Sequence, residues 1–420
     1  MLLDFAELIA SPAFALRARH PDFPEAFSRV RKLPLPALVA TLLVMRSGSQ
    51  QALLDTFFTN LRAAAGSSTG LLRVVSDRAF AKARSHLHMP ALCWLNDWVL
   101  HRAEAAAMVP RWQGLRLVAA DASVLMPAIR NCHRTRSPAS ADQRLFALYL
   151  PQAELTLHAC VHSAATSERA MLVEALDKLH PGDLLLLDRG YPAAWLVALL
   201  CERGIRFVMR CDKLTGWSAV RQFLRSGADQ AQVTINAPSA QDVADWACPA
   251  AAPSVRVVRN VSTNGRVRVL ATNLDAAEFP PECFGDLYHA RWKIEEAFKR
   301  LKHRYHLEAV SGLSQQALII DVAAKVLADN LASLACAAAQ AMRHADKPEA
   351  ATPRRCNRSF AARTLLHMLP AVLLLVGDVT AAIDNAIALL ARTTKQVHSG
   401  RYSPRPANHI KPHARFAYKG

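Results

Sequence analysis

Four side chains in one segment could act together on a phosphodiester. The segment Phe284–His303 reads FGDLYHARWKIEEAFKRLKH and predicts a single helix. At about 100° per residue, Tyr288, Arg291, Glu295 and Lys302 fall within about 60° of one another on one stripe. Glu295 could bind a hard cation, while Arg291 and Lys302 could bind phosphate oxygens. The alternative is an ordinary solvated helix with i,i+4 ion pairs.

A second stripe of the same predicted helix is apolar and lies within about 80°. Its members are Leu287, Ala290, Ile294, Phe298 and Leu301. This stripe predicts that the helix packs on a core with the charged stripe beside the contact.

The spacing of the charged stripe is Y-x2-R-x3-E-x6-K, and Trp292 and Glu296 complete the pattern YxxRWxIEE. This pattern resembles the signature of the insertion-sequence-four family of DDE transposases. The resemblance implies that Glu295 is the third catalytic carboxylate and that two catalytic aspartates lie upstream at strand ends. It also implies contacts with DNA from Tyr288, Arg291, Trp292 and Lys302.

Two aspartates fit that expectation. Asp121 ends the apolar run LRLVAAD, and Asp188 follows a run of leucines in LLLLDRGY. The DRGY element resembles the family's second motif, and Asp121-Ala122-Ser123 resembles its first. Taken singly, Asp121 could cap a turn, Asp188 could cap the helix after Pro192, and Glu295 could form a salt bridge.

Three carboxylates suit two-metal phosphoryl transfer. Two divalent cations about 3.5 to 4 Å apart activate a water or a 3′-hydroxyl and stabilise the leaving oxygen. Mg²⁺ prefers oxygen ligands and keeps several waters, so few protein ligands suffice. The predicted cofactor is therefore a pair of Mg²⁺ ions, with Mn²⁺ as a substitute. We expect Asp121 to bridge the ions, with Asp188 on one and Glu295 on the other.

The elements around the aspartates predict an α/β core. Short apolar runs predict five strands, and two amphipathic or apolar segments predict helices between them. In an open α/β sheet, sites form at the carboxyl edges of strands. The order three strands, helix, strand, helix, strand is typical of a ribonuclease-H-like mixed sheet. The strands are expected at 115–121, 145–150, 155–161, 184–187 and 205–209, and the helices at 167–179 and 192–201.

The rest of the chain divides by composition into flanking parts. After residue 212, strand-like segments include VRVVRN and RVRVLATN, joined by an Asn264-Gly265 turn. Trp217 and Trp246 in this part could simply pack; the family resemblance implies instead that a tryptophan of the inserted domain stacks on an extruded base. The predicted division is an all-helical DNA-binding domain at 1–110, the catalytic core at 111–212, a β-rich insertion at 213–280, the second part of the core with the catalytic helix at 281–345, and a helical C-terminal region with a basic tail at 346–420.

A basic helix in the N-terminal domain suggests contacts with DNA. Ser76 is a plausible N-cap, and Arg78 and Lys82 follow one turn apart, with Arg84 nearby. A helix, a turn and a basic helix form a DNA-binding arrangement. The alternative is an amphipathic helix whose cations only increase solubility. Further helices are expected in PEAFSRVRKL, PLPALVATLLVMRS, QQALLDTFFTNLRAAAG and PALCWLNDWVLHRAEAAA.

The charge balance favours a polyanionic partner. Among 420 residues, 51 Lys and Arg face 34 Asp and Glu, which gives a net charge of +17. The most apolar run, 369–390, contains Asp378 and Asp384, so a bilayer would have to accept two carboxylates. We expect no membrane contact, no signal peptide, and a location in the cytoplasm near the nucleoid.

The resemblance implies cut-and-paste DNA transposition. Its partners would be double-stranded DNA, first the inverted-repeat ends of the transposon and then target DNA, with a homodimer on paired ends. Two alternatives remain open. One is a metal-dependent nuclease of the same fold without strand transfer, and the other is a non-catalytic, transposase-derived regulator that only binds DNA.

Overall fold

The computed structural model describes residues 1–29, 32–65, 74–127, 142–211, 216–261, 265, 267–346 and 354–397. The chain divides into two compact units. The first comprises Met1–Met108, Leu125–Gln143 and Lys299–Gly420, and the second comprises Val109–Val124 and Arg144–Phe298. Of the basic tail, which was predicted at 392–420, residues 398–420 lie outside the described residues.

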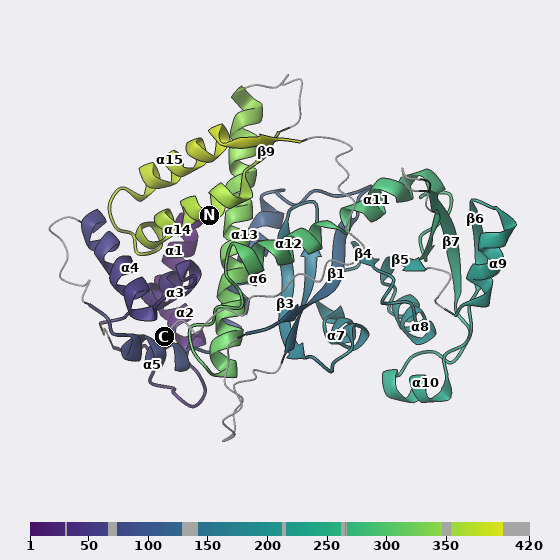
Figure 1. Cartoon of the computed structure of the whole chain (residues 1–420), viewed down its shortest axis with the longest axis horizontal. Coiled ribbons are helices and arrows are strands. Elements are labelled where there is room, and N and C mark those ends of the chain that lie inside the picture. Colours follow the sequence, from purple (N-terminus) through teal and green to yellow (C-terminus); the bar gives the residue numbers. More distant parts are fainter. Residues whose placement is uncertain are drawn as a thin grey trace. The chain divides into compact units, whose positions relative to one another are not determined.

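The second unit is built on a mixed sheet with the strand order β3-β2-β1-β4-β5-β8-β7-β6 (Figure 1). β1, β4 and β5 run parallel, whereas β8 is antiparallel to β5 and β7, and β6 is antiparallel to β7. The strands are β1 (Arg116–Leu125), β2 (Gln143–Leu150), β3 (Leu155–Ser163), β4 (Asp183–Leu187), β5 (Arg206–Cys211), β6 (Gln230–Thr234), β7 (Ser254–Val261) and β8 (Val267–Thr272).

The centre of this sheet is apolar because its strands are covered on both faces. All five residues of β4, DLLLL, are buried, which is the usual pattern of a central parallel strand. The one charge, Asp183, accepts two hydrogen bonds of 2.6 and 2.7 Å from the Arg116 guanidinium at the start of β1. This buried bidentate pair fixes β1 against β4 at the end remote from Asp121 and Asp188.

Strands were predicted close to their observed positions, but the segment 213–280 does not form a sheet of its own. β7 and β8 pair with each other, and β8 pairs with β5, so β6, β7 and β8 extend the same sheet. Helix α9 (Ser218–Ser226) packs against β6 and β7. The predicted helices at 167–179 and 192–201 correspond to α7 (Glu168–Glu174) with the short helix η1 (Leu176–Lys178), and to α8 (Ala194–Glu202).

The single helix predicted over 284–303 is wrong, because the structure has two. α11 (Phe284–Ala290) and α12 (Lys293–His303) are separated at Arg291 and Trp292. At the break the backbone bonds shorten to i→i−3, as from Ile294 N–H to the Arg291 carbonyl at 3.1 Å. A short 3₁₀ stretch of this kind tightens the turn and changes the direction in which neighbouring side chains point.

The first unit is helical. The 32-residue helix α13 (Gln315–Asp346) contacts α3, α6, α14 and α15, and it is the long green helix in Figure 1. The predicted N-cap is confirmed, since the Ser76 side chain accepts from the Ala79 N–H. The other helices of this unit are α1 (Leu2–Ala10), α2 (Pro12–Arg17), α3 (Leu35–Val44), α4 (Gln50–Ala65), α5 (Asp77–Ser85), α6 (Met89–Ala105), α14 (Arg358–Leu373) and α15 (Val379–Arg392).

One helix predicted in this unit is wrong. Residues 24–29 of PEAFSRVRKL form turns, and residues 30 and 31 lie outside the described ranges. Phe27 has a φ of +60°, a backbone conformation that a right-handed helix cannot accommodate. α1 and α2 were not predicted.

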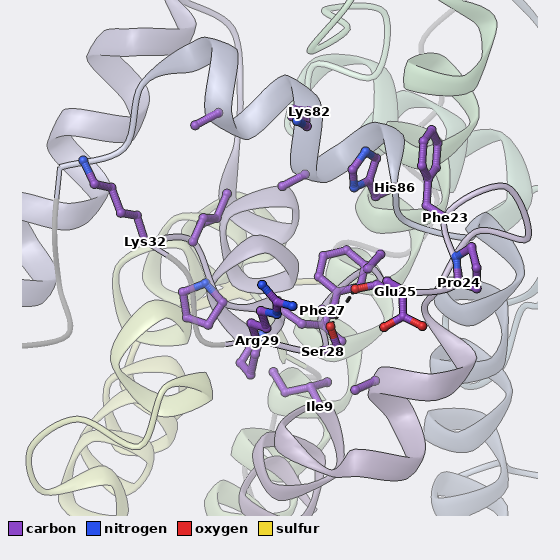
Figure 2. A pocket seen from close by; sticks show the side chains of 18 of the residues that line it. Ile9, Phe23, Pro24, Glu25, Phe27, Ser28, Arg29, Lys32, Lys82 and His86 are labelled. Atoms are coloured by element: carbon purple, nitrogen blue, oxygen red, sulfur yellow. Dashed lines mark hydrogen bonds between the residues drawn. The ribbon is translucent and has the colours of Figure 1, made fainter.

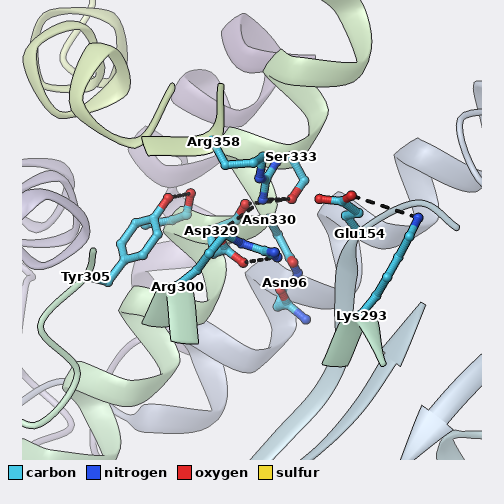
Figure 3. A network of polar contacts seen from close by, with 10 residues as sticks. Asn96, Glu154, Lys293, Arg300, Tyr305, Asp329, Asn330, Ser333 and Arg358 are labelled. Carbon is cyan, nitrogen blue, oxygen red and sulfur yellow. Dashed lines mark hydrogen bonds and ion pairs between the residues drawn. The ribbon is translucent and has the colours of Figure 1, made fainter. Parts of the chain in front are cut away.

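A buried carboxylate joins three helices of the first unit (Figure 3). Asp329 on α13 is 1% exposed and accepts hydrogen bonds from Arg300 on α12 and Arg358 on α14. Arg358 also donates to the Ser333 hydroxyl at 2.6 Å. Because two guanidinium groups satisfy this one carboxylate, the C-terminal part of α12 is fixed on α13.

No helix in the ranges that the structure describes is both long enough and apolar enough to cross a bilayer.

Candidate active site and DNA-contacting residues

Asp121 on β1 lies beside Asp188, which directly follows the neighbouring parallel strand β4. β1 and β4 are in register from Arg116↔Asp183 to Ala119↔Leu186, and two residues further on the same register places Asp121 beside Asp188. Adjacent strands are about 4.8 Å apart. The prediction that the strand ends at Asp121 is wrong, because β1 continues to Leu125 beside β2. What ends near Asp121 is the pairing with β4.

Asp188 is held by the turn that follows β4. Its Oδ1 accepts a 2.7 Å hydrogen bond from the Gly190 N–H. A Cβ atom at position 190 would lie 3.0 Å from that oxygen, so the close approach favours glycine. Asp188 does not cap the next helix, because α8 begins after Ala193 and has no side-chain cap. Its printed hydrogen bond is instead to the backbone of its own loop.

Burial and a like charge act together on Asp121. Burial raises the pKa of this carboxyl, Arg291 opposes the rise, and the nearby Asp188 carboxylate adds to it, which brings the pKa to about 7. One oxygen also accepts from the Ala122 N–H at 2.8 Å. A carboxylate with so high a pKa is poorly compensated as an anion, so it favours a cation beside it.

Arg291 joins Asp121 to Glu295. The guanidinium is 6% exposed, and its two terminal nitrogens donate to Asp121 Oδ2 at 3.4 Å and to Glu295 Oε1 at 3.3 Å. The salt bridge that was the alternative reading of Glu295 therefore exists, but it also brings in the Asp121 carboxylate. Arg291 thus links the turn before α12 to β1.

The other residues of the predicted charged stripe have different surroundings. Tyr288 is buried, its ring centroid lies 5.9 Å from the Arg291 guanidinium carbon, and burial raises its pKa to about 12. Trp292, at the break between α11 and α12, is 45% exposed. Tyr288 thus supports Arg291 from within the fold, whereas Trp292 lies at the surface.

Lys302 belongs to the first unit. Its Nζ lies 3.9 Å from Glu308 Oε1, and burial lowers its pKa. The Glu308 oxygen also accepts from the Met126 N–H at 2.9 Å. Lys302 is therefore paired with a carboxylate in this conformation, and a phosphate would have to compete with Glu308 for it.

The predicted metal ligands do not form a compact cluster in this conformation. Within the described ranges, no group of three or more Asp, Glu, His or Cys side chains is close enough to hold a metal ion. Asp121 and Glu295 are kept apart because the Arg291 guanidinium lies between them. The donor set still fits a hard divalent cation, because these are carboxylate oxygens and the pKa of Asp121 shows that its charge is undercompensated.

A family model described as "Transposase DDE domain" matches residues 116–331, just over half of the chain. The chain belongs to this family. It is a DDE transposase, an enzyme of DNA transposition and recombination, and the matched range runs from the first residue of β1 into α13.

Among solved structures, the transposase is similar to a chain of a piggyBac transposase synaptic complex with hairpin DNA. The two are 11% identical with a TM-score of 0.40, and the match covers 93% of this chain and 82% of that chain. Among curated proteins, none matches.

Two side chains near Asp188 were given no role from the sequence. Glu168 at the start of α7 and the buried Tyr191 both lie near Asp188. Tyr191 was quoted within DRGY but given no role, and Glu168 has no spacing that marks it. A signal was available for Glu168, since it opens the helix between β3 and the strand that leads to Asp188.

The basic side chains predicted to meet DNA separate into two kinds. Arg78 and Lys82 on α5 are exposed, and Lys82 borders a pocket of about 1100 Å³ together with Arg29, Lys32 and His86 (Figure 2). Arg84 was predicted to lie with them, and this is wrong. It is 7% exposed and donates to the carbonyl and hydroxyl of Ser311, so its charge is used within the fold.

The two tryptophans of segment 213–280 pack. Trp217 is buried, and Trp246 stacks on Trp195 of α8 with ring centroids 4.3 Å apart and planes 3° from parallel. The packing alternative therefore describes both, since Trp217 is buried and one face of Trp246 lies against Trp195.

Proposed function

We propose that this transposase moves DNA by a cut-and-paste reaction as a member of the insertion-sequence-four family. The single observation that carries the proposal is the position of Asp121 beside Asp188, with Arg291 linking Asp121 to Glu295. The strand order β3-β2-β1-β4-β5, with β1, β4 and β5 parallel, supports a ribonuclease-H-like core to which β8, β7 and β6 are added.

The catalytic residues of the proposal are Asp121, Asp188 and Glu295. They would hold two Mg²⁺ ions, or Mn²⁺ in their place, with Asp121 shared between them. When bound, such a pair activates a water or a 3′-hydroxyl and stabilises the leaving oxygen.

Arg291 has two roles in the proposed reaction. In the present conformation it compensates Asp121 and Glu295, which would otherwise be left with an uncompensated charge. Once another cation compensates these carboxylates, its terminal nitrogens can donate to a phosphate, and two parallel N–H bonds would orient the phosphodiester. Tyr288, packed beside it, keeps the guanidinium in place.

Binding of double-stranded DNA is proposed from charge and position. The net charge of +17 favours a polyanion. Arg78 and Lys82 would contact phosphates from α5, and Lys302 and the exposed Trp292 would contact DNA from α12 and the turn before it. A homodimer on paired transposon ends is part of the proposal and rests on the family resemblance.

The test uses the transposase with DNA from its own flanking inverted repeats and Mg²⁺. Cleavage followed by strand transfer supports the proposal. Cleavage alone indicates a nuclease, and binding alone indicates a non-catalytic regulator.

Asp188→Ala should abolish cleavage yet leave end binding, because it removes a ligand and no DNA contact. A matched control is Asp177→Ala in the same unit, whose carboxylate is 96% exposed. A variant Asp188→Ala that cuts at the wild-type rate would refute the assignment.

A further inference from the structure

The start of α7 is fastened to the loop that carries Asp188. Ser167 caps the helix by accepting from the Ala170 N–H at 3.2 Å. Arg169 Nε donates to the carbonyls of Gly190 and Tyr191, both at 3.1 Å, and its Nη2 donates to the Pro192 carbonyl at 3.0 Å. Three hydrogen bonds from one guanidinium fix the position of the preceding residue, Glu168, relative to Asp188.

Glu168 directs one carboxylate oxygen toward Asp188. A Cβ atom on Gly190 would lie 3.0 Å from Asp188 Oδ1 and 3.5 Å from Glu168 Oε2, so both oxygens border the same small space above this glycine. The other oxygen, Oε1, lies 3.6 Å from Arg144. Burial, and then the Asp188 charge, raise the pKa of Glu168. Arg144 therefore holds one side of the carboxylate and leaves the other toward Asp188.

A buried hydroxyl lies among the same acids. Tyr191 is fully buried, and its hydroxyl has no hydrogen-bond partner among the described residues. Burial raises its pKa well above the ordinary value, and the Asp121, Glu168 and Asp188 carboxylates raise it further. A buried polar group without a partner in the fold indicates that a group absent from the free protein belongs beside it.

We propose that Glu168 is a fourth carboxylate of the active site, which binds the divalent cation on the side of Asp121 and Asp188. The inference rests on the proposed function and adds a ligand that the three-carboxylate arrangement does not include. Its physical basis is that oxygens of Asp188 and Glu168 border one small space and that Asp121 lies beside Asp188, while the Arg291 guanidinium donates to Asp121 and Glu295. Carboxylate oxygens are the ligands that Mg²⁺ and Mn²⁺ take.

The test measures Mn²⁺ binding to the full-length transposase by titration calorimetry, without DNA. Glu168→Gln removes the charge and keeps the shape, so it should weaken Mn²⁺ binding by about tenfold or more. In cleavage assays, the variant should need a correspondingly higher Mn²⁺ concentration for its half-maximal rate. Thermal unfolding without metal checks that the variant is folded. If it is not, Glu168→Asp serves, because a shorter side chain that keeps its charge should also weaken Mn²⁺ binding.

Two controls separate a ligand from a structural residue. Arg144→Gln breaks the same ion pair but keeps the Glu168 carboxylate, so it should leave Mn²⁺ affinity within about twofold. Glu174→Gln, at the other end of α7 with a 64% exposed side chain, should behave like the wild type. If Glu168→Gln binds Mn²⁺ like the wild type, or only as weakly as Arg144→Gln does, the inference is overturned.

The two proposals fail in different ways. If Asp188→Ala abolishes both Mn²⁺ binding and cleavage while Glu168→Gln changes neither, only the fourth ligand is refuted. If Asp188→Ala changes neither, the proposed function itself is refuted.

Discussion

At the scale of the residue, one guanidinium decides the state of two carboxylates. Arg291 is buried and donates to both Asp121 and Glu295. Even with this partner, the pKa of Asp121 is raised to about 7. The ionised Asp121 carboxylate therefore destabilises the folded state, and a bound cation would remove this destabilisation.

Arg291→Gln should make stability depend more strongly on pH. Because Arg291 lowers the pKa of Asp121, that pKa should be higher still in the variant. At alkaline pH, where Asp121 is ionised, the variant leaves this carboxylate uncompensated, and the free energy of unfolding should fall by about 3 kcal/mol. The pKa of Asp121 in the folded state exceeds that in the unfolded state, so the folded protein takes up a proton as the pH falls through about 7. The loss should therefore be smaller at acidic than at alkaline pH.

Urea unfolding on both sides of this pKa measures the effect. Arg291→Lys is the control, because it keeps the positive charge. An equal loss at both pH values would contradict the role assigned to Arg291.

At the scale of the element, two departures from regular structure create the site. β1 continues past the end of its pairing with β4, so Asp121 remains on a strand while Asp188 lies in a turn. The break between α11 and α12 falls at Arg291 and Trp292, with Arg291 directed to Asp121 and Trp292 exposed. The first departure places Asp121 beside Asp188, and the second places Arg291 beside Asp121.

Strand β3 carries a histidine with its own effect on stability. Burial lowers the pKa of His158 to about 4, and the positive charges of Lys178 and His162 contribute. The folded state keeps the ring neutral, whereas the unfolded ring titrates at about 6.5. Its contribution is therefore fully present above pH 6.5 and is lost as the pH falls toward 4.

His158→Gln should consequently reduce the acid sensitivity of the protein. Between neutral pH and the pKa of His158, the wild type should lose about 3 kcal/mol more of its unfolding free energy than the variant does. Urea unfolding at both pH values measures this difference. Asp121 has the opposite effect on stability, but it is present in both proteins and cancels in the difference. The exposed His101, changed to Gln, is the control. Parallel pH profiles of wild type and His158→Gln would contradict the prediction.

At the scale of the whole molecule, some basic side chains pair within the fold and others are exposed. Arg84, Arg116, Arg300 and Arg358 hold buried or largely buried partners within the fold. Arg78 and Lys82 are exposed on α5. Only the second kind can release counterions from DNA, so net charge overstates the number of contacts.

Changing both Arg78 and Lys82 to Gln should weaken DNA binding and flatten its dependence on salt. Each lost phosphate contact should reduce the slope of log K against log salt by about 0.9. Fluorescence anisotropy over a series of salt concentrations measures the slope. Arg84→Gln is the contrasting variant, because it should lower the melting temperature and leave the slope unchanged. An unchanged slope in the double variant would exclude α5 from the DNA interface.

The sequence by itself determined the kinds of elements and most of their positions. The leucine run before Asp188 predicted a buried strand, the spacing through Arg291 and Glu295 marked the helical segment, and Ser76 marked a helix start. Such signals are local, because periodicity, caps and turn residues act over a few neighbours. They also carried the resemblance to DDE transposases, with which the family match agrees.

Only the tertiary structure decided which side chains meet. The register that sets Asp121 beside Asp188 joins residues far apart in the chain, as does the bond from Arg291 to Asp121. Arg84 and Lys82 are two residues apart, and the sequence pattern does not distinguish them. Only Arg84 is buried, where it donates to Ser311. The reason is physical: burial and pairing are set by what packs from distant segments, and this fixes both the charge state and the use of an ionisable group.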